Sequence, residues 1–183
     1  MLPPGGAEID LAVMFVDIRG STALGEGMGP RQFAGLLDEF YGIASDAVVA
    51  HKGVIDKMIG DEVMALFIPS TVGGDLGQAA VGTAVDVLHA VRGIGDGLPV
   101  GIGIHFGPAY VGKVGTENVN DFTAVGDTVN TTARLQSQAK AGEIVMSEAV
   151  YGSVADRYPD MESRTIEVKG KAKPVEIRVL RPD

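Results

Sequence analysis

Two amphipathic helical patterns, each set between strand-like segments, limit most strongly how this chain can fold. The first pattern begins at Pro30 and ends before Gly53, and the second covers residues 76–92. An apolar run at 11–16 precedes the first pattern, and residues 53–69 divide at a Gly-Asp pair into two short strands. A further strand follows the second pattern. This order predicts an α+β fold with a ferredoxin-like βαββαβ core.

The strand expected at 99–107 has one unusual face. Its apolar residues alternate with glycine or a polar residue over the sequence PVGIGIHFG. A strand that is bare on one face is typical of a place where a helix or a ligand packs closely against the backbone. We therefore expect another element to lie against this strand.

The last third of the chain predicts additional C-terminal strands and helices. We expect two strands, NDFTAVG (120–126) and GEIVMS (142–147), a helix from about Thr128 to Gln138, and a short helix after Ser147. A final hairpin is expected from RTIEVKG and KPVEIRVL, with its turn around Lys171-Ala172.

Length and composition describe an ordinary globular domain. The chain has 183 residues, of which 45% are hydrophobic and 21% charged, and no segment approaches the roughly 18 apolar residues that a membrane helix needs. Residues 1–8 are rich in proline and glycine, so we expect a linker there, or the point where a domain was cut from a longer protein, and a folded domain at 9–183. The absence of cysteine excludes disulfides and fits a reducing compartment, so we expect a cytoplasmic location.

The charge balance limits the kinds of partner that this chain can bind. A formal net charge of −9, with only 5% aromatic residues, disfavours nucleic acid or an anionic membrane surface as the main partner. An acidic protein that handles phosphates needs bound cations. Carboxylates that could hold such cations are therefore candidate site residues.

Asp17 ends the first apolar run, and the small polar loop Gly20-Ser21-Thr22 follows it. A carboxylate at the end of a buried strand is costly unless it is paired or holds a metal, although such a residue can also simply cap the next turn. Free backbone N–H groups ahead of a helix suit a phosphate. In the expected topology the first strand is antiparallel to the strand that leaves the hairpin, so Asp17 and Asp61 share one edge of the sheet.

Neighbouring strands lie about 4.8 Å apart, so the two carboxylates can converge on the same ions. Two acids that close repel each other unless one is protonated or a cation lies between them. The sequence therefore predicts a site for divalent metal at this edge, with Mg²⁺ the natural ion. The alternative is that Asp61 serves only the turn.

A second group of polar residues follows later in the chain. Asn130 and Arg134 are four residues apart, so they project from one face of a helix and suit charge on phosphate and ribose oxygens. The alternative for this pair is a solvated helix face. Lys57 can likewise be a lysine that guards a sheet edge, and Lys169 and Lys171 can be solvent charges beside a turn.

Four ordered motifs resemble the catalytic domain of class III nucleotidyl cyclases. They are FVDIRGST (15–22), KMIGDEVMALF (57–67), VGDTVNTTARL (125–135) and VKGKAKPVE (168–176). The resemblance covers nearly the whole chain from about Leu11. It implies the class III cyclase fold and a head-to-tail homodimer with two shared active sites.

The resemblance also implies individual roles. Asp17 and Asp61, with the backbone carbonyl of Ile18, are similar to the ligands of two Mg²⁺ (or Mn²⁺) ions, and Gly20, Ser21 and Thr22 to the triphosphate cradle. In the family, these ions assist attack of the ribose 3′-hydroxyl on the α-phosphorus.

On the partner's side of each site, the family places an Asn/Arg pair that orients the ribose and stabilises the transition state, here matched by Asn130 and Arg134. Lys169 matches a lysine that holds the terminal phosphates. Lys57 matches the residue that favours adenine. At the second adenine-selecting position, Thr123 replaces the common aspartate and resembles the bacterial class IIIb, whose members often respond to bicarbonate.

These features predict an adenylate cyclase that converts ATP to 3′,5′-cyclic AMP and pyrophosphate. Because a hydroxyl can both accept and donate a hydrogen bond, Thr123 leaves a guanylyl cyclase or a cyclase of relaxed specificity as an alternative. A catalytically silent cyclase-like domain that only dimerises or binds a regulator is the other alternative.

Overall fold

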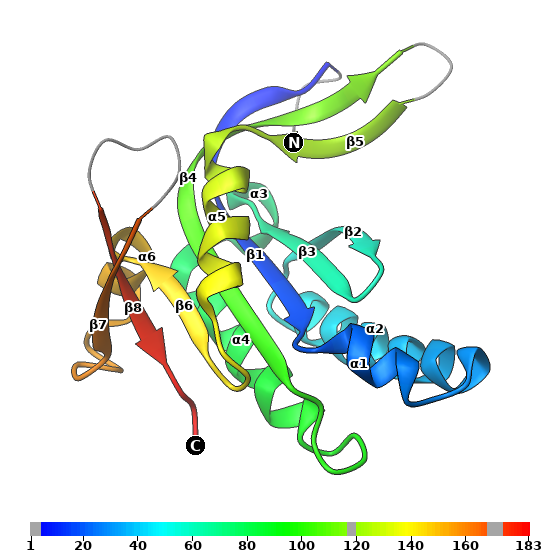
Figure 1. Cartoon of the computed structure of the whole chain (residues 1–183). Coiled ribbons are helices and arrows are strands. Elements are labelled where there is room, and N and C mark those ends of the chain that lie inside the picture. Colours follow the sequence, from blue (N-terminus) through cyan, green and yellow to red (C-terminus); the bar gives the residue numbers. More distant parts are fainter. Residues whose placement is uncertain (1–4, 117–119, 168–173) are drawn as a thin grey trace.

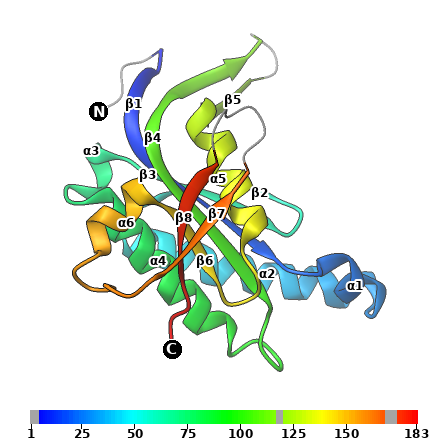
Figure 2. The same cartoon turned by 60° about the vertical axis from the view of Figure 1, so that its left-hand side comes forward.

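In the computed structural model, which describes residues 5–116, 120–167 and 174–183, one mixed sheet carries helices on both faces (Figures 1 and 2). The strands of this described part are β1 (Ala7–Ile18), β2 (Val54–Ile59), β3 (Glu62–Phe67), β4 (Val100–Gly115), β5 (Asn120–Val125), β6 (Ile144–Ser147), β7 (Glu162–Ile166) and β8 (Val175–Leu180). Its helices are α1 (Ser21–Glu26), α2 (Pro30–Ala50), α3 (Pro69–Val72), α4 (Leu76–Val91), α5 (Asp127–Gln138) and α6 (Glu148–Val154). None of these helices is both long and apolar enough to cross a membrane.

The predicted ferredoxin-like core is confirmed. The strand order β2-β3-β1-β4 places β1 between β3 and β4 and antiparallel to both. The sheet continues through β6, β8 and β7, and β5 pairs with the far part of β4. The C-terminal strands and helices therefore extend the same sheet.

Alternate residues of β1 pack into two different cores. Ala12, Met14 and Val16 face α2 and α4 in the larger core, whereas Val13 and Phe15 face the side of the sheet that α5 partly covers. This alternation is the period of two that a strand imposes. Asp17 continues the second series, so its side chain belongs to the α5 side.

Glycines in β4 let α5 lie directly against the sheet. A Cβ added at Gly103 would come within 2.3 Å of the Gln136 backbone nitrogen, and one at Gly107 within 2.7 Å of the Thr128 hydroxyl. The bare strand face expected from the sequence is thus covered by a helix. This contact fixes the height of α5 above β1 and β4.

Several elements differ from the sequence predictions. β1 starts at Ala7, inside the segment expected to be a linker, because it pairs with β4 as far as Val111. β4 runs on to Gly115 and forms with β5 an arm that extends beyond the rest of the sheet (Figure 1). A short helix, α1, forms in part of the expected loop, and α3 was not expected. The turn of the last hairpin lies outside the described residues.

Candidate active site

Asp17 and Asp61 lie together at the end of β1. Asp17 pairs in register with Glu62, the first residue of β3, and the backbone N–H of Ile18 donates to the Asp61 carbonyl at 3.2 Å. The sequence placed these two acids at one sheet edge, and the structure brings them there from segments more than forty residues apart.

Negative charge exceeds positive charge in the acidic group formed by Asp17, Asp61 and Glu62. Burial and, in addition, the neighbouring Asp61 carboxylate raise the pKa of Asp17. Burial likewise raises the pKa of Glu62, and the charges of Asp17 and Asp61 add to the effect. For Asp17, the side-chain amide of Gln136 and, less strongly, the guanidinium of Arg19, which lies 3.7 Å from Asp17 Oδ2, oppose the rise without cancelling it; Arg19 also opposes the rise for Glu62.

The residues present fit a divalent cation. Asp17 Oδ1 is buried and has no hydrogen-bond partner, which is costly for a carboxylate oxygen unless a cation takes its place. No group of three or more metal-ligating side chains occurs in the described part of the chain. A site with two carboxylates and a nearby backbone carbonyl suits Mg²⁺, which keeps waters and phosphate oxygens in much of its shell.

A cavity of about 220 Å³ adjoins the acidic pair. Its lining includes Ser21 and Thr22 of α1, Phe33 and Leu37 of α2, and Asp61 of the β2–β3 turn. Gly20, which precedes α1, has a φ of 68°, a left-handed conformation that glycine adopts without strain. The loop proposed to cradle a triphosphate therefore shares a hollow with one of the two carboxylates.

Lys57 and Thr123 are brought together on neighbouring parts of β2 and β5. Lys57 Nζ donates to Asp121 Oδ2 at 3.1 Å and lies 3.4 Å from Asp56 Oδ2. Burial would lower the pKa of Lys57, but the hydrogen bond to Asp121 and the charge of Asp56 outweigh it, so the pKa is raised. Lys57 is thus a fixed cation at neutral pH.

Asp56 is the residue of this group that sequence reasoning missed. Its side chain is only 2% exposed, and it accepts hydrogen bonds from the Thr123 hydroxyl at 2.7 Å and the Ala124 N–H at 3.2 Å. The available signal was the pair of adjacent charges, Asp56 and Lys57, within a short apolar strand. In a regular strand these neighbours would point to opposite faces, so only a bulge lets both reach β5.

Asn130 and Arg134 lie on the side of α5 that faces away from the sheet. The buried residues of α5 include Thr128, Thr131 and Leu135, and the two predicted catalytic residues lie on the opposite side of the helix, Asn130 exposed and Arg134 half-buried. Within one chain their side chains therefore point away from the sheet face on which Asp17 lies. Lys169, the proposed phosphate-binding lysine, lies outside the described residues.

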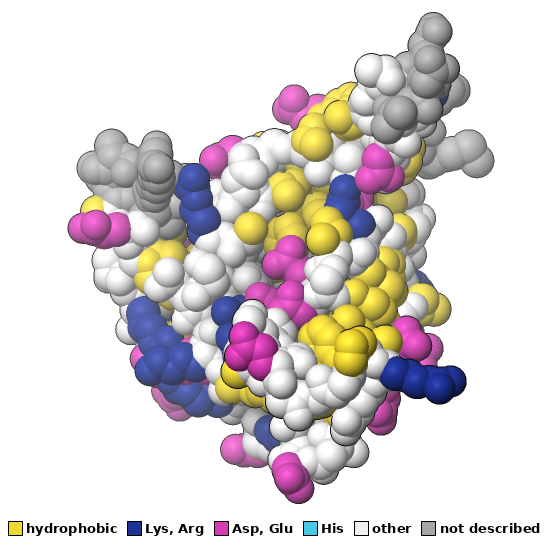
Figure 3. Space-filling view, turned by 45° about the vertical axis from the view of Figure 1, so that its right-hand side comes forward, with side chains coloured by type: hydrophobic (Ala, Val, Ile, Leu, Met, Phe, Trp, Pro, Cys, Tyr) yellow, Lys and Arg dark blue, Asp and Glu magenta, His cyan; other side chains and the backbone are white. Residues whose placement is uncertain are grey.

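Large hydrophobic side chains are exposed beside these groups. Those more than a third exposed are Val49, Val54, Met58, Ile59, Val114, Phe122 and Val125, which come mainly from β2, β5 and the end of β4. Figure 3 shows acidic side chains in the middle of one face, with hydrophobic side chains mainly above and to the right of them. Such a surface is typical of a contact with another protein.

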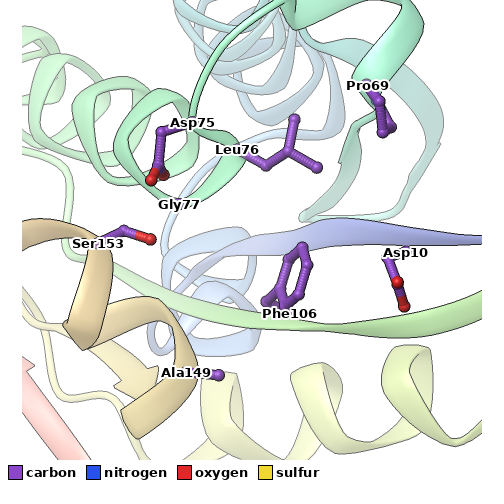
Figure 4. Close-up of a pocket in the computed structure, with 8 residues that line it drawn as sticks. All are labelled: Asp10, Pro69, Asp75, Leu76, Gly77, Phe106, Ala149 and Ser153. Carbon is purple, nitrogen blue, oxygen red and sulfur yellow. The ribbon is translucent and has the colours of Figure 1, made fainter.

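A second cavity, of about 270 Å³, lies on the other face of the sheet (Figure 4). Asp10 and Phe106 line it from β1 and β4, Leu76 from α4 and Ser153 from α6. Asp10 belongs to the β1 series that faces α2 and α4, opposite to Asp17. This cavity is therefore separate from the acidic pair.

Comparison with known families identifies the family to which this fold belongs. Residues 7–180 match the family described as the adenylate and guanylate cyclase catalytic domain. The chain belongs to this family of class III nucleotidyl cyclase domains.

Similar proteins and structures carry both activities in their names. Adenylate cyclase 1 of Rhizobium meliloti is 30% identical and adenylate cyclase of Anabaena cylindrica 31%, over 92% and 91% of this chain. The structure of the guanylyl cyclase Cya2 matches with a TM-score of 0.89 at 30% identity, covering 96% of this chain and 93% of that one. The adenylyl cyclase CyaB from P. aeruginosa matches with a TM-score of 0.83 at 31% identity, covering 96% and 95%.

The chain spans about a third of the length of the curated relatives it matches, 27% and 36% of the two adenylate cyclases. The guanylyl cyclase Cya2 and the adenylyl cyclase CyaB are almost equally identical to it. Overall similarity therefore gives the family and the fold, and the choice of purine depends on the residues of the site.

Proposed function

We propose that this domain is an adenylate cyclase that converts ATP to 3′,5′-cyclic AMP and pyrophosphate. The observation that favours ATP over GTP is the meeting of Lys57 and Thr123 at Asp56. Adenine offers an acceptor at N1 and a donor at its 6-amino group, whereas guanine offers a donor at N1 and an acceptor at O6. A lysine ammonium can only donate, so Lys57 complements adenine N1 and opposes the guanine N1–H.

Asp17 and Asp61, with the Ile18 carbonyl, would hold two divalent cations, Mg²⁺ or Mn²⁺, over the triphosphate. Such cations lower the pKa of the attacking hydroxyl and neutralise charge on the phosphates. The chain supplies the support for this site: the partnerless Oδ1 of Asp17, the raised pKa of Asp17, and the adjoining cavity lined by Ser21 and Thr22.

Asn130 and Arg134 act, in this proposal, on the nucleotide held by the other chain of a homodimer. As the bond from the ribose 3′-oxygen to the α-phosphorus forms, the bond to pyrophosphate breaks and the hydroxyl proton is released. Arg134 meets the negative charge that develops at the α-phosphate, and Asn130 orients the ribose. Their position on the outward side of α5 supports action across an interface. Lys169 is proposed to bind the terminal phosphates.

The homodimer itself is supported by the exposed hydrophobic surface around the acidic face, to which Ile59 (60% exposed) and Phe122 (57% exposed) contribute. Mixing two inactive variants tests the shared site. Asp17→Ala and Arg134→Ala should each be inactive alone and regain activity together, because each heterodimer rebuilds one intact site. Heterodimers that form and stay inactive would contradict the shared cleft.

The decisive experiment measures both purines. Purified protein with Mg²⁺ or Mn²⁺ should form cyclic AMP and pyrophosphate from ATP with a higher kcat/KM than cyclic GMP from GTP. The match to guanylyl cyclase Cya2 favours a relaxed or guanylyl specificity as the second candidate, which equal or greater use of GTP would reveal. A dimeric, folded protein that cyclises neither nucleotide would instead be a silent cyclase-like domain.

Membership of class IIIb and a response to bicarbonate rest on Thr123 alone and stay predictions. Stimulated turnover in bicarbonate at constant pH and ionic strength would support the response. An unchanged rate would end it.

A further inference from the structure

A β-bulge in β2 places two neighbouring charges on the same side of the strand. Ile55 pairs with Ala65 and Lys57 with Met64, so the register shifts by one residue between them and Asp56 is the extra residue. Bulges of this kind re-aim side chains next to functional sites. Here the bulge lets Asp56 reach Thr123 while Lys57 reaches Asp121, two positions earlier on β5.

We propose that Asp56 fixes the Thr123 hydroxyl as a hydrogen-bond acceptor toward the purine and thereby sets the preference for adenine over guanine. This inference rests on the proposed adenylate cyclase function. Asp56 is a positioning residue, because it acts on the nucleotide only through Thr123.

The hydrogen-bond inventory gives the reason. A threonine hydroxyl has one proton and two lone pairs, whereas an ionised carboxylate can only accept. Asp56 Oδ2 takes the Thr123 proton at 2.7 Å, and Oδ1 is held by the Ala124 N–H at 3.2 Å. The proton of Thr123 is thus committed, and only lone pairs remain for a ligand. They match the 6-amino group of adenine and oppose O6 of guanine.

This arrangement gives a neutral residue the hydrogen-bonding character of an aspartate. An aspartate at position 123 would place a third carboxylate beside Asp56 and Asp121, with Lys57 as the nearby cation. Threonine avoids that repulsion. The selectivity that the sequence left open at Thr123 is therefore decided by a residue on another strand.

Asp56→Asn is the sharpest variant, because it reverses the polarity of one bond. The fixed Ala124 N–H needs an acceptor, so it holds the amide oxygen of Asn, and the amide NH₂ takes the place of Oδ2 and donates to Thr123. The Thr123 proton is then free to point at the purine. The ratio of kcat/KM for ATP to that for GTP should fall about tenfold or more, with a gain in GTP use.

Two further variants show whether the effect passes through Thr123. Thr123→Val should itself lower the ATP/GTP ratio, and adding Asp56→Asn to it should change the ratio no further. Thr123→Asp combined with Asp56→Asn should restore ATP preference, because the new carboxylate accepts and Asn donates to it. Asp86→Asn is the matched control, since the Asp86 carboxylate also lies 2.7 Å from its hydrogen-bond partner, His51. Asp86 belongs to α4 and His51 directly follows α2, so neither belongs to β2 or β5. The ATP/GTP ratio of Asp86→Asn should equal that of the parent.

The outcomes separate this inference from the proposed function. If the parent uses ATP, two results overturn this inference and leave the proposed function intact. One is an ATP/GTP ratio that Asp56→Asn does not change, and the other is a fall of the ratio by the same factor when Asp56→Asn is added to Thr123→Val. If Asp56→Asn does not fold, an unchanged ratio in Thr123→Val overturns it as well. A dimeric parent that does not cyclise ATP refutes the proposed adenylate cyclase before Asp56 is considered.

Discussion

Replacing Asp17 by Asn should make the metal-free protein more stable while it removes activity. Asp17 Oδ1 is buried without a partner, and burial and Asp61 raise the pKa of the side chain, so its charge opposes folding at neutral pH. Asn keeps a polar atom in the same place but removes the charge, and an unsatisfied buried group costs about 1–3 kcal/mol when it is neutral and more when it is charged. Since the side chain is 24% exposed, we expect a gain of about 1–2 kcal/mol, or about 2–8 °C for a chain of this length.

Added metal should reverse the order of the two proteins. At a metal concentration a hundred times the dissociation constant, binding stabilises a folded protein by about 2.7 kcal/mol. The parent should gain this amount, and Asp17→Asn, with one carboxylate left, only a small part of it. Without metal the variant melts higher, and with metal the parent does. Turnover should fall on the order of a hundredfold or more.

The assay is thermal unfolding with EDTA and with Mg²⁺ or Mn²⁺, at fixed protein concentration because a dimer melts in a concentration-dependent way. The pH adds a check of sign. Because the pKa of Asp17 is raised in the folded protein, the destabilisation by its charge begins as the pH rises above the ordinary value of 3.8 and is complete above the raised pKa. The gain in Asp17→Asn should therefore disappear as the pH falls below 3.8. Asp86→Asn is the control. A lower melting point of Asp17→Asn in EDTA, or a full metal shift in that variant, would refute the reasoning.

Three further predictions concern other parts of the molecule. Lys57→Glu should lower kcat/KM for ATP tenfold or more, and unchanged discrimination against GTP would remove its proposed role. Glu143, which accepts bonds from Arg164, has its pKa lowered to about 2, so Glu143→Gln should cost about 3 kcal/mol at pH 7; urea unfolding should show the parent losing this advantage between pH 4.5 and 2, and a flat difference would contradict it. Gly103→Ala should cost about 1–3 kcal/mol in thermal unfolding, because its Cβ would meet the Gln136 backbone; an unchanged melting point would show that α5 can shift freely.

Hydrophobic periodicity was enough to predict the core. The two helical patterns became α2 and α4, and the split at Gly60-Asp61 became the β2–β3 turn. Each of these elements buries one continuous face, so the hydrophobic period of each is visible in the sequence. The bare face of β4 was also readable, because only glycine tolerates a helix backbone as close as that of Gln136.

Elements held by distant partners could not be predicted in the same way. The far part of β4 contains Pro108 and several glycines, which reads as loop, and it is a strand only because β1 and β5 pair with it. The first residues of β1, from Ala7, depend on the same pairing. Tertiary hydrogen bonds decide such segments, and local propensity does not.

The features of the candidate site differ in the same way in how far the sequence predicts them. That Asp17 and Asp61 share a sheet edge followed from strand order alone, since the edge is a property of the topology. The part played by Asp56 depends on a one-residue register shift in β2. The local sequence gives no signal of such a shift, because the shift is defined only by the pairing of β2 with β3.

The two halves of the proposed site differ in their charge balance, and this difference gives a physical reason for the proposed metal ions and the proposed second chain. The purine end is balanced within one chain, since Lys57 lies between Asp56 and Asp121. The phosphate end is not, since within the described part of the chain the pKa values of Asp17 and Glu62 are raised despite the guanidinium of Arg19, in a protein of net charge −9. A triphosphate cannot approach such a group until positive charge is supplied. Under the proposed function, divalent cations would supply part of that charge, and cationic side chains of a partner chain would supply the rest.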